Sequence, residues 1–248
     1  MGQRYDIILT CNPTRGAKTF HPPAPALCPA AELSYLCGHK SICIMEKLES
    51  TAGTCPQGME GIRNVVFDFG GVLIDWNPRY FFKSYFRDDE RMEYFLTHVC
   101  SPEWNARQDA GRSLAEGVAE AKALHPEFAE AIDCYYAHFP ETLGGCIEQN
   151  VERLRRYKAE GYGVYGLTNW AAETFPHALR RFDFLRLLDG IVVSGEEHLS
   201  KPDPAIFRLL LSRYGLKAEE CLFLDDNADN IQAAAALGFR VELTDCRA

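Results

Sequence analysis

One aspartate, Asp68, follows a short apolar run and directly precedes a glycine turn. Residues 65–67 suit a strand buried in a parallel sheet, and Gly70 and Gly71 let the backbone turn sharply beside a ligand. Open α/β sheets place ligand sites at the carboxyl ends of their strands, where Asp68 would stand. The segment predicts a carboxylate nucleophile presented by a strand, although Asp68 taken alone could equally cap a turn.

A pair of aspartates ends another apolar strand. Residues 221–224 lead into Asp225 and Asp226, and Asn227 follows before an alanine-rich helix. Adjacent carboxylates repel each other unless a cation neutralises them, so a bound metal is the simplest explanation. Oxygen ligands without a nearby histidine or cysteine favour Mg²⁺ over zinc. The alternative is that Asp226 or Asn227 only caps the helix.

A third strand, at 164–167, ends in Thr168 and Asn169, before a helix expected to begin near Ala171. The Thr168 hydroxyl and the N–H groups of a helix start can donate hydrogen bonds to an anion. In the simpler interpretation, both polar residues are ordinary helix caps.

A lysine precedes the next predicted helix. Lys201 lies on a loop bounded by proline, and Asp203 and Pro204 have the residue types preferred at a helix start. From a rigid loop, a lysine can reach inward to a phosphate or a carboxylate. Most lysines are instead solvated surface charges, and that alternative stays open here.

Composition limits the classes of partner. The chain has 248 residues, 47% hydrophobic content and a formal charge of −9. This charge argues against nucleic acid or an anionic membrane surface as a partner, and a small-molecule partner fits better. No apolar run approaches the ~20 residues of a membrane span, so a cytoplasmic location is expected. Oligomeric state leaves no trace in the sequence.

Short apolar strands alternate with amphipathic helices from residue 62 onward, which predicts an α/β fold with a doubly wound parallel sheet. The expected strands are 63–68, 162–168, 189–194, 220–225 and 239–243, and the expected helices are 147–160, 171–181, 204–214 and 228–237. Residues 78–145 are too many for a simple crossover and are rich in helix formers, so they should form a helical cap inserted after the first strand. Residues 61–77 and 146–248 would form the core.

Residues 1–60 have no sustained periodicity and are expected to be a disordered leader, or to lie outside the natural reading frame with Met59 as the start. Cys37, His39 and Cys43 could bind zinc, but their spacing matches no common zinc finger, and reduced thiols are the favoured interpretation.

Together and in this order, the four segments resemble the haloacid dehalogenase-like hydrolase superfamily, over residues 62–243. The resemblance is closest to capped phosphatases whose first motif is Asp-x-Gly-Gly. It implies that Asp68 is a nucleophile that forms an aspartyl-phosphate, and that Thr168 and Lys201 bind the transferred phosphoryl group. It also implies a Mg²⁺ site formed by Asp68, the Gly70 carbonyl, Asp225 and Asp226, with Asp225 alternatively orienting the lysine. The expected function is hydrolysis of a small phosphomonoester, such as a sugar phosphate.

One departure from the family pattern is Gly70, which stands where phosphatases of this superfamily carry a second aspartate as general acid and base. A positioned acid or base is worth about 10²–10⁴-fold in rate, so a slow enzyme or a replacement group is expected. Good leaving groups, such as a sugar 1-phosphate or an aryl phosphate, should suffer least. Asp75, Glu103 and Asp109 are possible replacements that the sequence does not rank.

The cap should supply the substrate contacts that the core lacks. Asn105 and Arg107 are the predicted contacts, with Gly70 and Asn169 on the core side, and Trp76, Asn77 and Trp170 could also line the pocket. Two alternatives remain. One is a dehalogenase, which would use the same aspartate without metal, although the Asp225 and Asp226 pair argues against it. The other is a phosphoryl-compound sensor with little activity.

Overall fold

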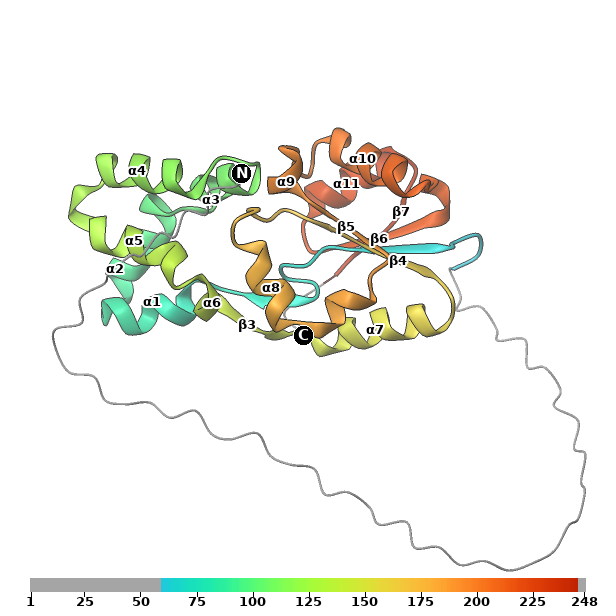
Figure 1. Ribbon diagram of the computed structural model, residues 1–248, viewed down its shortest axis with the longest axis horizontal. Coiled ribbons are helices and arrows are strands. Elements are labelled where there is room, and N and C mark those ends of the chain that lie inside the picture. Colours follow the sequence, from blue (N-terminus) through green and yellow to red (C-terminus); the bar gives the residue numbers. More distant parts are fainter. Residues whose placement is uncertain (1–58, 245–248) are drawn as a thin grey trace, which may run out of the picture. The chain divides into compact units, whose positions relative to one another are not determined.

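The computed structural model describes residues 59–244, which belong to one compact unit spanning residues 53–248. Its centre is a parallel sheet of five strands in the order β5-β4-β1-β6-β7 (Figure 1). The strands are β1 (Asn64–Phe67), β4 (Gly163–Thr168), β5 (Gly190–Val193), β6 (Cys221–Asp225) and β7 (Arg240–Leu243). The predicted α/β fold with a doubly wound parallel sheet is confirmed.

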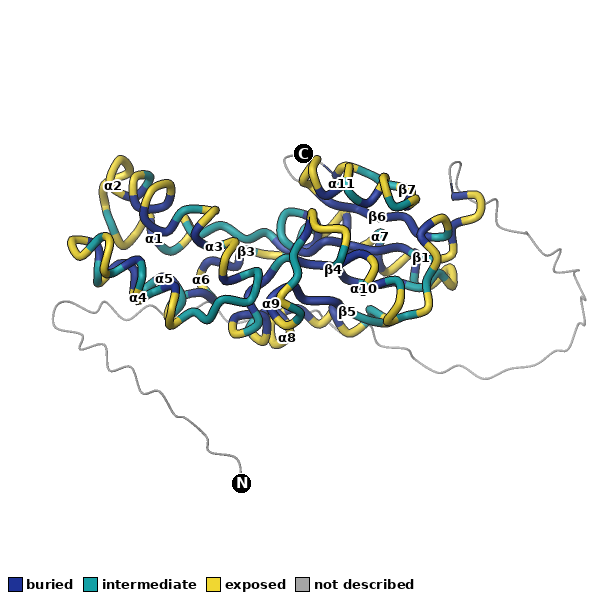
Figure 2. The backbone as a smooth tube through the Cα atoms, turned by 90° about the horizontal axis from the view of Figure 1, so that it is seen from above, coloured by how far each residue is buried: buried dark blue, intermediate teal, exposed yellow. Residues whose placement is uncertain are grey.

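Helices cover both faces of this sheet because its inner strands are apolar on both sides. In β1, Val65 and Phe67 pack into one core cluster and Val66 into another, as expected where successive side chains point to opposite faces. Figure 1 shows helices above and below the sheet, and Figure 2 shows that the strands between them are largely buried. Residues of α7 (Glu148–Ala159) and α8 (Phe175–Arg181) join the first cluster, and those of α10 (Pro204–Tyr214) and α11 (Ala228–Ala236) the second.

The helix after β4 begins later than the sequence indicates. It starts at Phe175 instead of Ala171 because the intervening residues turn into the core. The Trp170 backbone N–H donates to Ser194 Oγ at 2.9 Å, and its indole Nε1 donates to Thr174 Oγ1 at 3.0 Å. The expected helix start near Ala171 is therefore four residues too early.

The strand register gathers the ends of three strands. Phe67 of β1 pairs with Gly166 of β4 on one side and with Leu224 of β6 on the other. Asp68 and Asp225 directly follow these pairs and Thr168 lies two residues after Gly166, so all three reach the same edge of the sheet. This is the carboxyl edge, where open parallel sheets bind ligands.

The helices between Arg79 and Thr142, where the sequence predicts a cap, have a hydrophobic cluster of their own, which contains Phe82, Phe95, Trp104, Ile132 and Tyr135 among others; we call this segment the cap. Its helices are α1 (Arg79–Phe86), α2 (Asp89–Tyr94), a π-helix (Phe95–Val99), α3 (Pro102–Asp109), α4 (Leu114–Leu124), α5 (Ala129–Ala137) and α6 (Phe139–Thr142). Two short antiparallel strands, β2 (Ile74–Trp76) and β3 (Leu143–Cys146), join the cap to the core. The sequence does not indicate this strand pair because each strand is too short to show a period.

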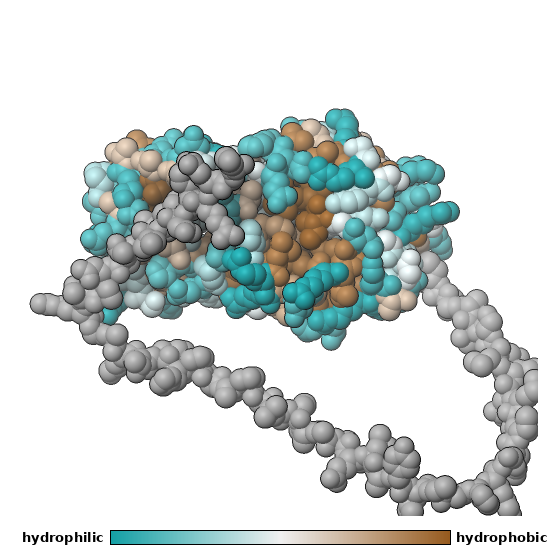
Figure 3. Space-filling view, viewed as in Figure 1, coloured by the Kyte–Doolittle hydropathy of each residue, from teal (hydrophilic) through white to brown (hydrophobic). Residues whose placement is uncertain are grey.

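Short elements complete the described fold. They are α9 (Ser194–Glu197) and three 3-10 segments, Pro126–Phe128, Asp183–Leu187 and Ala218–Glu220. Hydrophobic side chains gather on the face of the core seen in Figure 3. Leu187, Leu188 and Ile191, in and just before β5, are partly buried against the first core cluster. Among the described residues, no helix is both long enough and apolar enough to cross a membrane. The leader, 1–60, with its zinc-ligand candidates Cys37, His39 and Cys43, falls almost entirely outside the described residues.

Candidate active site

A buried lysine joins two of the strand-end aspartates. Lys201 Nζ lies 2.8 Å from Asp68 Oδ1 and donates to Asp225 Oδ2 at 2.7 Å. Its side chain is 1% exposed, so the interpretation of Lys201 as a solvated surface charge is wrong. A buried ammonium group is stable only when it is paired, and these two carboxylates provide the pairing.

The lysine loop is fixed by Asn169 at the end of β4. Asn169 Nδ2 donates to the Lys201 carbonyl at 2.8 Å, and the Lys201 N–H donates to Asn169 Oδ1 at 2.9 Å. This reciprocal pair holds the lysine backbone against the strand end. Asn169, expected to contact substrate, therefore also positions Lys201.

Asp225 has protein donors on both carboxylate oxygens. In addition to Lys201, Oδ1 accepts from the Asn227 N–H at 2.8 Å, and Asn230 Nδ2 lies 3.0 and 3.1 Å from the two oxygens. Asp225 is completely buried. This environment favours the predicted role in orienting the lysine over that of a direct metal ligand. The sequence analysis did not identify Asn230 as a partner of Asp225. Its position in the first turn of the helix that follows Asp225 could have indicated it.

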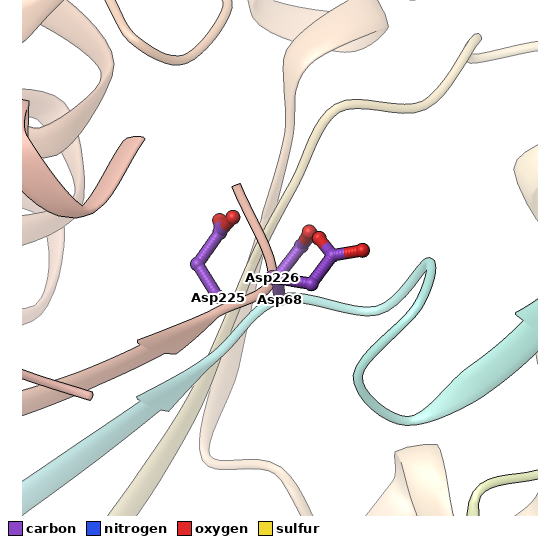
Figure 4. Close-up of side chains that lie close together, drawn as sticks. All are labelled: Asp68, Asp225 and Asp226. Atoms are coloured by element: carbon purple, nitrogen blue, oxygen red, sulfur yellow. The ribbon is translucent and has the colours of Figure 1, made fainter. Parts of the chain in front are cut away.

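The three aspartates form an acidic cluster with room for a cation. Asp68, Asp225 and Asp226 each offer a carboxylate oxygen, and these oxygens all lie within 4.8 Å of one another (Figure 4). The turn after Asp68 fits closely around them: a Cβ added to Gly71, whose φ is +75°, would lie 2.1 Å from Asp226 Oδ2. Three carboxylates face one ammonium group, and an all-oxygen donor set is what Mg²⁺ prefers. The residues therefore fit Mg²⁺, with Asp68 and Asp226 as the best-placed carboxylate ligands.

Thr168 provides a donor without a protein partner. Its side chain is 1% exposed, and its hydroxyl has no hydrogen-bond partner within the part of the chain that the structure describes. Leaving a buried hydroxyl unpaired costs about 1–3 kcal/mol, so such a group calls for a ligand or water. At the end of β4, beside Asp68 on β1, the hydroxyl is placed to donate to an anion bound by the aspartate.

Burial and charge set the protonation of Asp68 and Lys201. Burial raises the pKa of Asp68 to about 7, the charge of Lys201 lowers it, and the charge of Asp225 raises it. Burial lowers the pKa of Lys201, but its two aspartate partners outweigh that effect and raise it overall. The lysine thus stays cationic at neutral pH.

Two cavities adjoin at the strand ends and share Gly70, Trp76 and Asn169 in their walls. The first also contains Asp68, Gly71, Asp75, Tyr80, Cys146, Ile147 and Asp226. The second, which we call the cap-side cavity, has a volume of about 70 Å³. It is lined in addition by Asn105, Asp109, Tyr136, Phe139, Trp170, Ala171 and Thr174. The predicted pocket residues Trp76 and Trp170 are therefore in place.

Of the two substrate contacts predicted in the cap, Asn105 lines one of these cavities and Arg107 lines neither. Asn105 faces the cap-side cavity, where its side chain bonds to Asp109 and Tyr136. Arg107 lines neither of the two cavities and pairs with Glu120 at 2.8 Å on the surface. Asn77 also lies outside both walls, and its side chain accepts from the N–H of Arg79 at the start of α1.

Comparison with known proteins defines the class. A model of the haloacid dehalogenase-like hydrolase family matches residues 62–238, so the chain belongs to this family and is a hydrolase. The sesquiterpene phosphatase astK of Aspergillus oryzae is 30% identical over 189 residues, which cover 73% of this chain and 89% of that protein. Acyl-CoA dehydrogenase family member 10 of Mus musculus is 44% identical over 198 residues, which cover 73% of this chain but 18% of that protein.

A solved structure shares the fold. The HAD family enzyme bt-2542 of Bacteroides thetaiotaomicron, solved with magnesium and inorganic phosphate, superposes with a TM-score of 0.59 at 22% identity. The match covers 75% of this chain and 96% of that one. At this identity the likeness establishes the fold, and the chemistry has to be argued from the residues of this chain.

Proposed function

We propose that this protein is a Mg²⁺-dependent phosphatase that hydrolyses a small phosphomonoester through an aspartyl-phosphate on Asp68. The observation that carries the proposal is the buried ion pair of Asp68 and Lys201 inside a cluster of three carboxylates. A nucleophilic carboxylate, a fixed cation and a further cation site are together what phosphoryl transfer requires.

Each residue has a distinct role in this proposal. An Asp68 oxygen attacks phosphorus, and the bond from phosphorus to the leaving oxygen breaks. Lys201 and the Thr168 hydroxyl offset charge on the phosphoryl oxygens, and Asn169 and Asp225 keep the lysine in place. Water then attacks phosphorus, which releases phosphate and restores the Asp68 carboxylate.

Magnesium would be held by Asp68, Asp226 and the Gly70 carbonyl, with Asp225 beside them. When bound, Mg²⁺ neutralises the charge that builds up between nucleophile and phosphate. The named activity of astK and the magnesium and phosphate in the bt-2542 structure support the same assignment here.

The substrate we propose is a small phosphorylated molecule, with sugar phosphates as one class. The cap-side cavity carries the aromatic residues Trp76, Tyr136, Phe139 and Trp170, together with Asn105. Such walls suit a sugar ring as well as a hydrocarbon group, so both types of ester belong in a substrate panel. A net charge of −9 favours small-molecule partners over nucleic acid, and the location we propose for the enzyme is the cytoplasm.

The test is phosphate release from a panel of phosphomonoesters by the full chain, with and without Mg²⁺. We expect release that needs the metal and is lost in Asp68→Asn. The matched control is Asp183→Asn, because the Asp183 side chain is 84% exposed and distant in sequence from every motif. Halide release without metal would instead identify a dehalogenase, and phosphate binding without turnover would identify a sensor.

A further inference from the structure

The proposed chemistry leaves one proton without a carrier. The leaving oxygen needs a proton when its bond to phosphorus breaks, and the attacking water must lose one in the second step. Gly70, the residue two positions after the nucleophile, has no side chain to do either. A replacement acid must reach the same space from elsewhere in the fold.

Asp109, at the end of α3 in the cap, lies in the wall of the cap-side cavity. That cavity shares Gly70, Trp76 and Asn169 with the cavity that contains Asp68. Asp109 and Gly70 therefore line the same cavity, into which the leaving group of a phosphate bound at Asp68 would extend.

Hydrogen bonds hold Asp109 against the core. Asn105 Nδ2 donates to Asp109 Oδ2 at 2.8 Å, and the backbone N–H of Ala171 donates to the same carboxyl group. Ser194 Oγ donates to the Asp109 carbonyl at 2.5 Å while accepting from the Trp170 N–H. The acid is therefore tied to the loop that follows Thr168, although it belongs to the cap.

The surroundings of Asp109 suit an acid that gains and loses a proton near neutrality. Burial raises the pKa of Asp109 to about 7, the bonds from Ala171 and Asn105 lower it, and the charge of Asp68 raises it. Tyr135 and Tyr136 of α5 also interact with it, and burial raises the pKa of both, so both are neutral.

The other two acids are less well placed. Glu103 is exposed on the surface of α3, and its pKa is lowered by hydrogen bonds with its own backbone and Ser101. Asp75 lines the cavity that contains Asp68 and accepts from the Tyr80 hydroxyl at 2.5 Å. Neither lines the cavity towards the cap.

We propose that Asp109 is the general acid and base of this phosphatase, donated by the cap in place of the missing core aspartate. This inference rests on the function proposed above. In the first step the Asp109 carboxyl proton passes to the leaving oxygen as its bond to phosphorus breaks. In the second step the Asp109 carboxylate takes a proton from the water that attacks the aspartyl-phosphate, and the bond from phosphorus to the Asp68 oxygen breaks.

The test compares Asp109→Asn with the unmodified enzyme on an alkyl phosphate and on p-nitrophenyl phosphate. For the alkyl ester we expect kcat to fall by about 10²–10⁴-fold, because its leaving group needs the proton. Nitrophenolate leaves without one, so the variant should release one equivalent per enzyme in a rapid burst. Slow turnover should follow, because hydrolysis of the aspartyl-phosphate lacks its base.

Two further variants separate chemistry from structure. Glu103→Gln, on the same helix, should match the unmodified enzyme on both esters. Gly70→Asp in the Asp109→Asn background should restore part of the alkyl phosphatase activity, because a Cβ at Gly70 meets no atom within 4 Å.

Two results would overturn the inference. Equal losses on both esters without a burst would show that Asp109 only docks the cap, and unchanged kinetics would show that it has no role. If the unmodified enzyme released no phosphate from any ester, the proposed function itself would fail, and this inference with it.

Discussion

Two acids of this enzyme, Asp68 in the core and Asp109 in the cap, have pKa values raised by burial to about 7 but differ in what holds them. Asp68 follows a central strand and pairs with the ammonium group of Lys201. Asp109 ends a cap helix, and its partners are the neutral amide groups of Asn105 and Ala171. A fixed cation stabilises a carboxylate that attacks, whereas neutral donors leave an acid able to exchange its proton.

In the core, the charge of Asp68 is balanced by Lys201. Lys201→Met would leave Asp68 and Asp225 buried without their cation, and breaking such a pair costs about 3–5 kcal/mol of unfolding free energy. Urea denaturation should show this loss, and Mg²⁺ should restore part of it by replacing the charge. Lys217→Met, at a lysine whose side chain is 66% exposed, should be near neutral. An unchanged unfolding free energy in Lys201→Met would contradict a stabilising ion pair between Lys201 and the two aspartates.

Neighbouring glycines test the turn that shapes the proposed metal site. Gly71→Ala should cost about 1–3 kcal/mol through its positive φ, and its methyl group should displace Asp226 and weaken Mg²⁺ binding. Gly70→Ala is the matched control, because its Cβ has open space and its carbonyl is retained. Calorimetric Mg²⁺ titrations of the two variants check this, and equal affinities would place the metal elsewhere.

Metal affinity should also depend on pH through Asp68. With a pKa of about 7, Asp68 is protonated at lower pH, and Mg²⁺ must displace that proton to bind. Affinity should therefore fall by about tenfold for each pH unit below about 7, or about 1.4 kcal/mol. The dependence should disappear in Asp68→Asn. A pH-independent affinity in the unmodified enzyme would exclude Asp68 as a ligand.

A further prediction concerns the cap acid and the pH dependence of folding stability. The pKa of Asp109 is higher in the folded state, about 7, than its ordinary value of 3.8, so the folded state binds the proton more tightly. The contribution of Asp109 to folding stability is thus greatest at low pH and is lost as pH rises from about 4 to about 7. Asp109→Asn should melt at a higher temperature than the unmodified enzyme at about pH 8, and the advantage should vanish near pH 4.

The core strands and the position of a helical insertion were predictable from sequence, whereas the contacts between that insertion and the core were not. Buried parallel strands leave continuous apolar runs, so the ends carrying Asp68, Thr168 and Asp225 could be located from local sequence. Asp109 was one of three acids that could not be ranked, because its donor Ala171 is remote in sequence and joins it through folding. The late start of α8 has the same origin, since Ser194 and Thr174 draw the Trp170 segment inward against its local helix pattern.

The central claim, covalent catalysis by Asp68, is tested most directly by trapping the intermediate. Enzyme mixed with p-nitrophenyl phosphate and Mg²⁺ is quenched in acid within one turnover, and its peptides are weighed by mass spectrometry. We expect one phosphoryl group on the peptide that contains Asp68, with more of it in Asp109→Asn and none in Asp68→Asn. A phosphoryl group on another residue, or undiminished phosphate release by Asp68→Asn, would contradict the account.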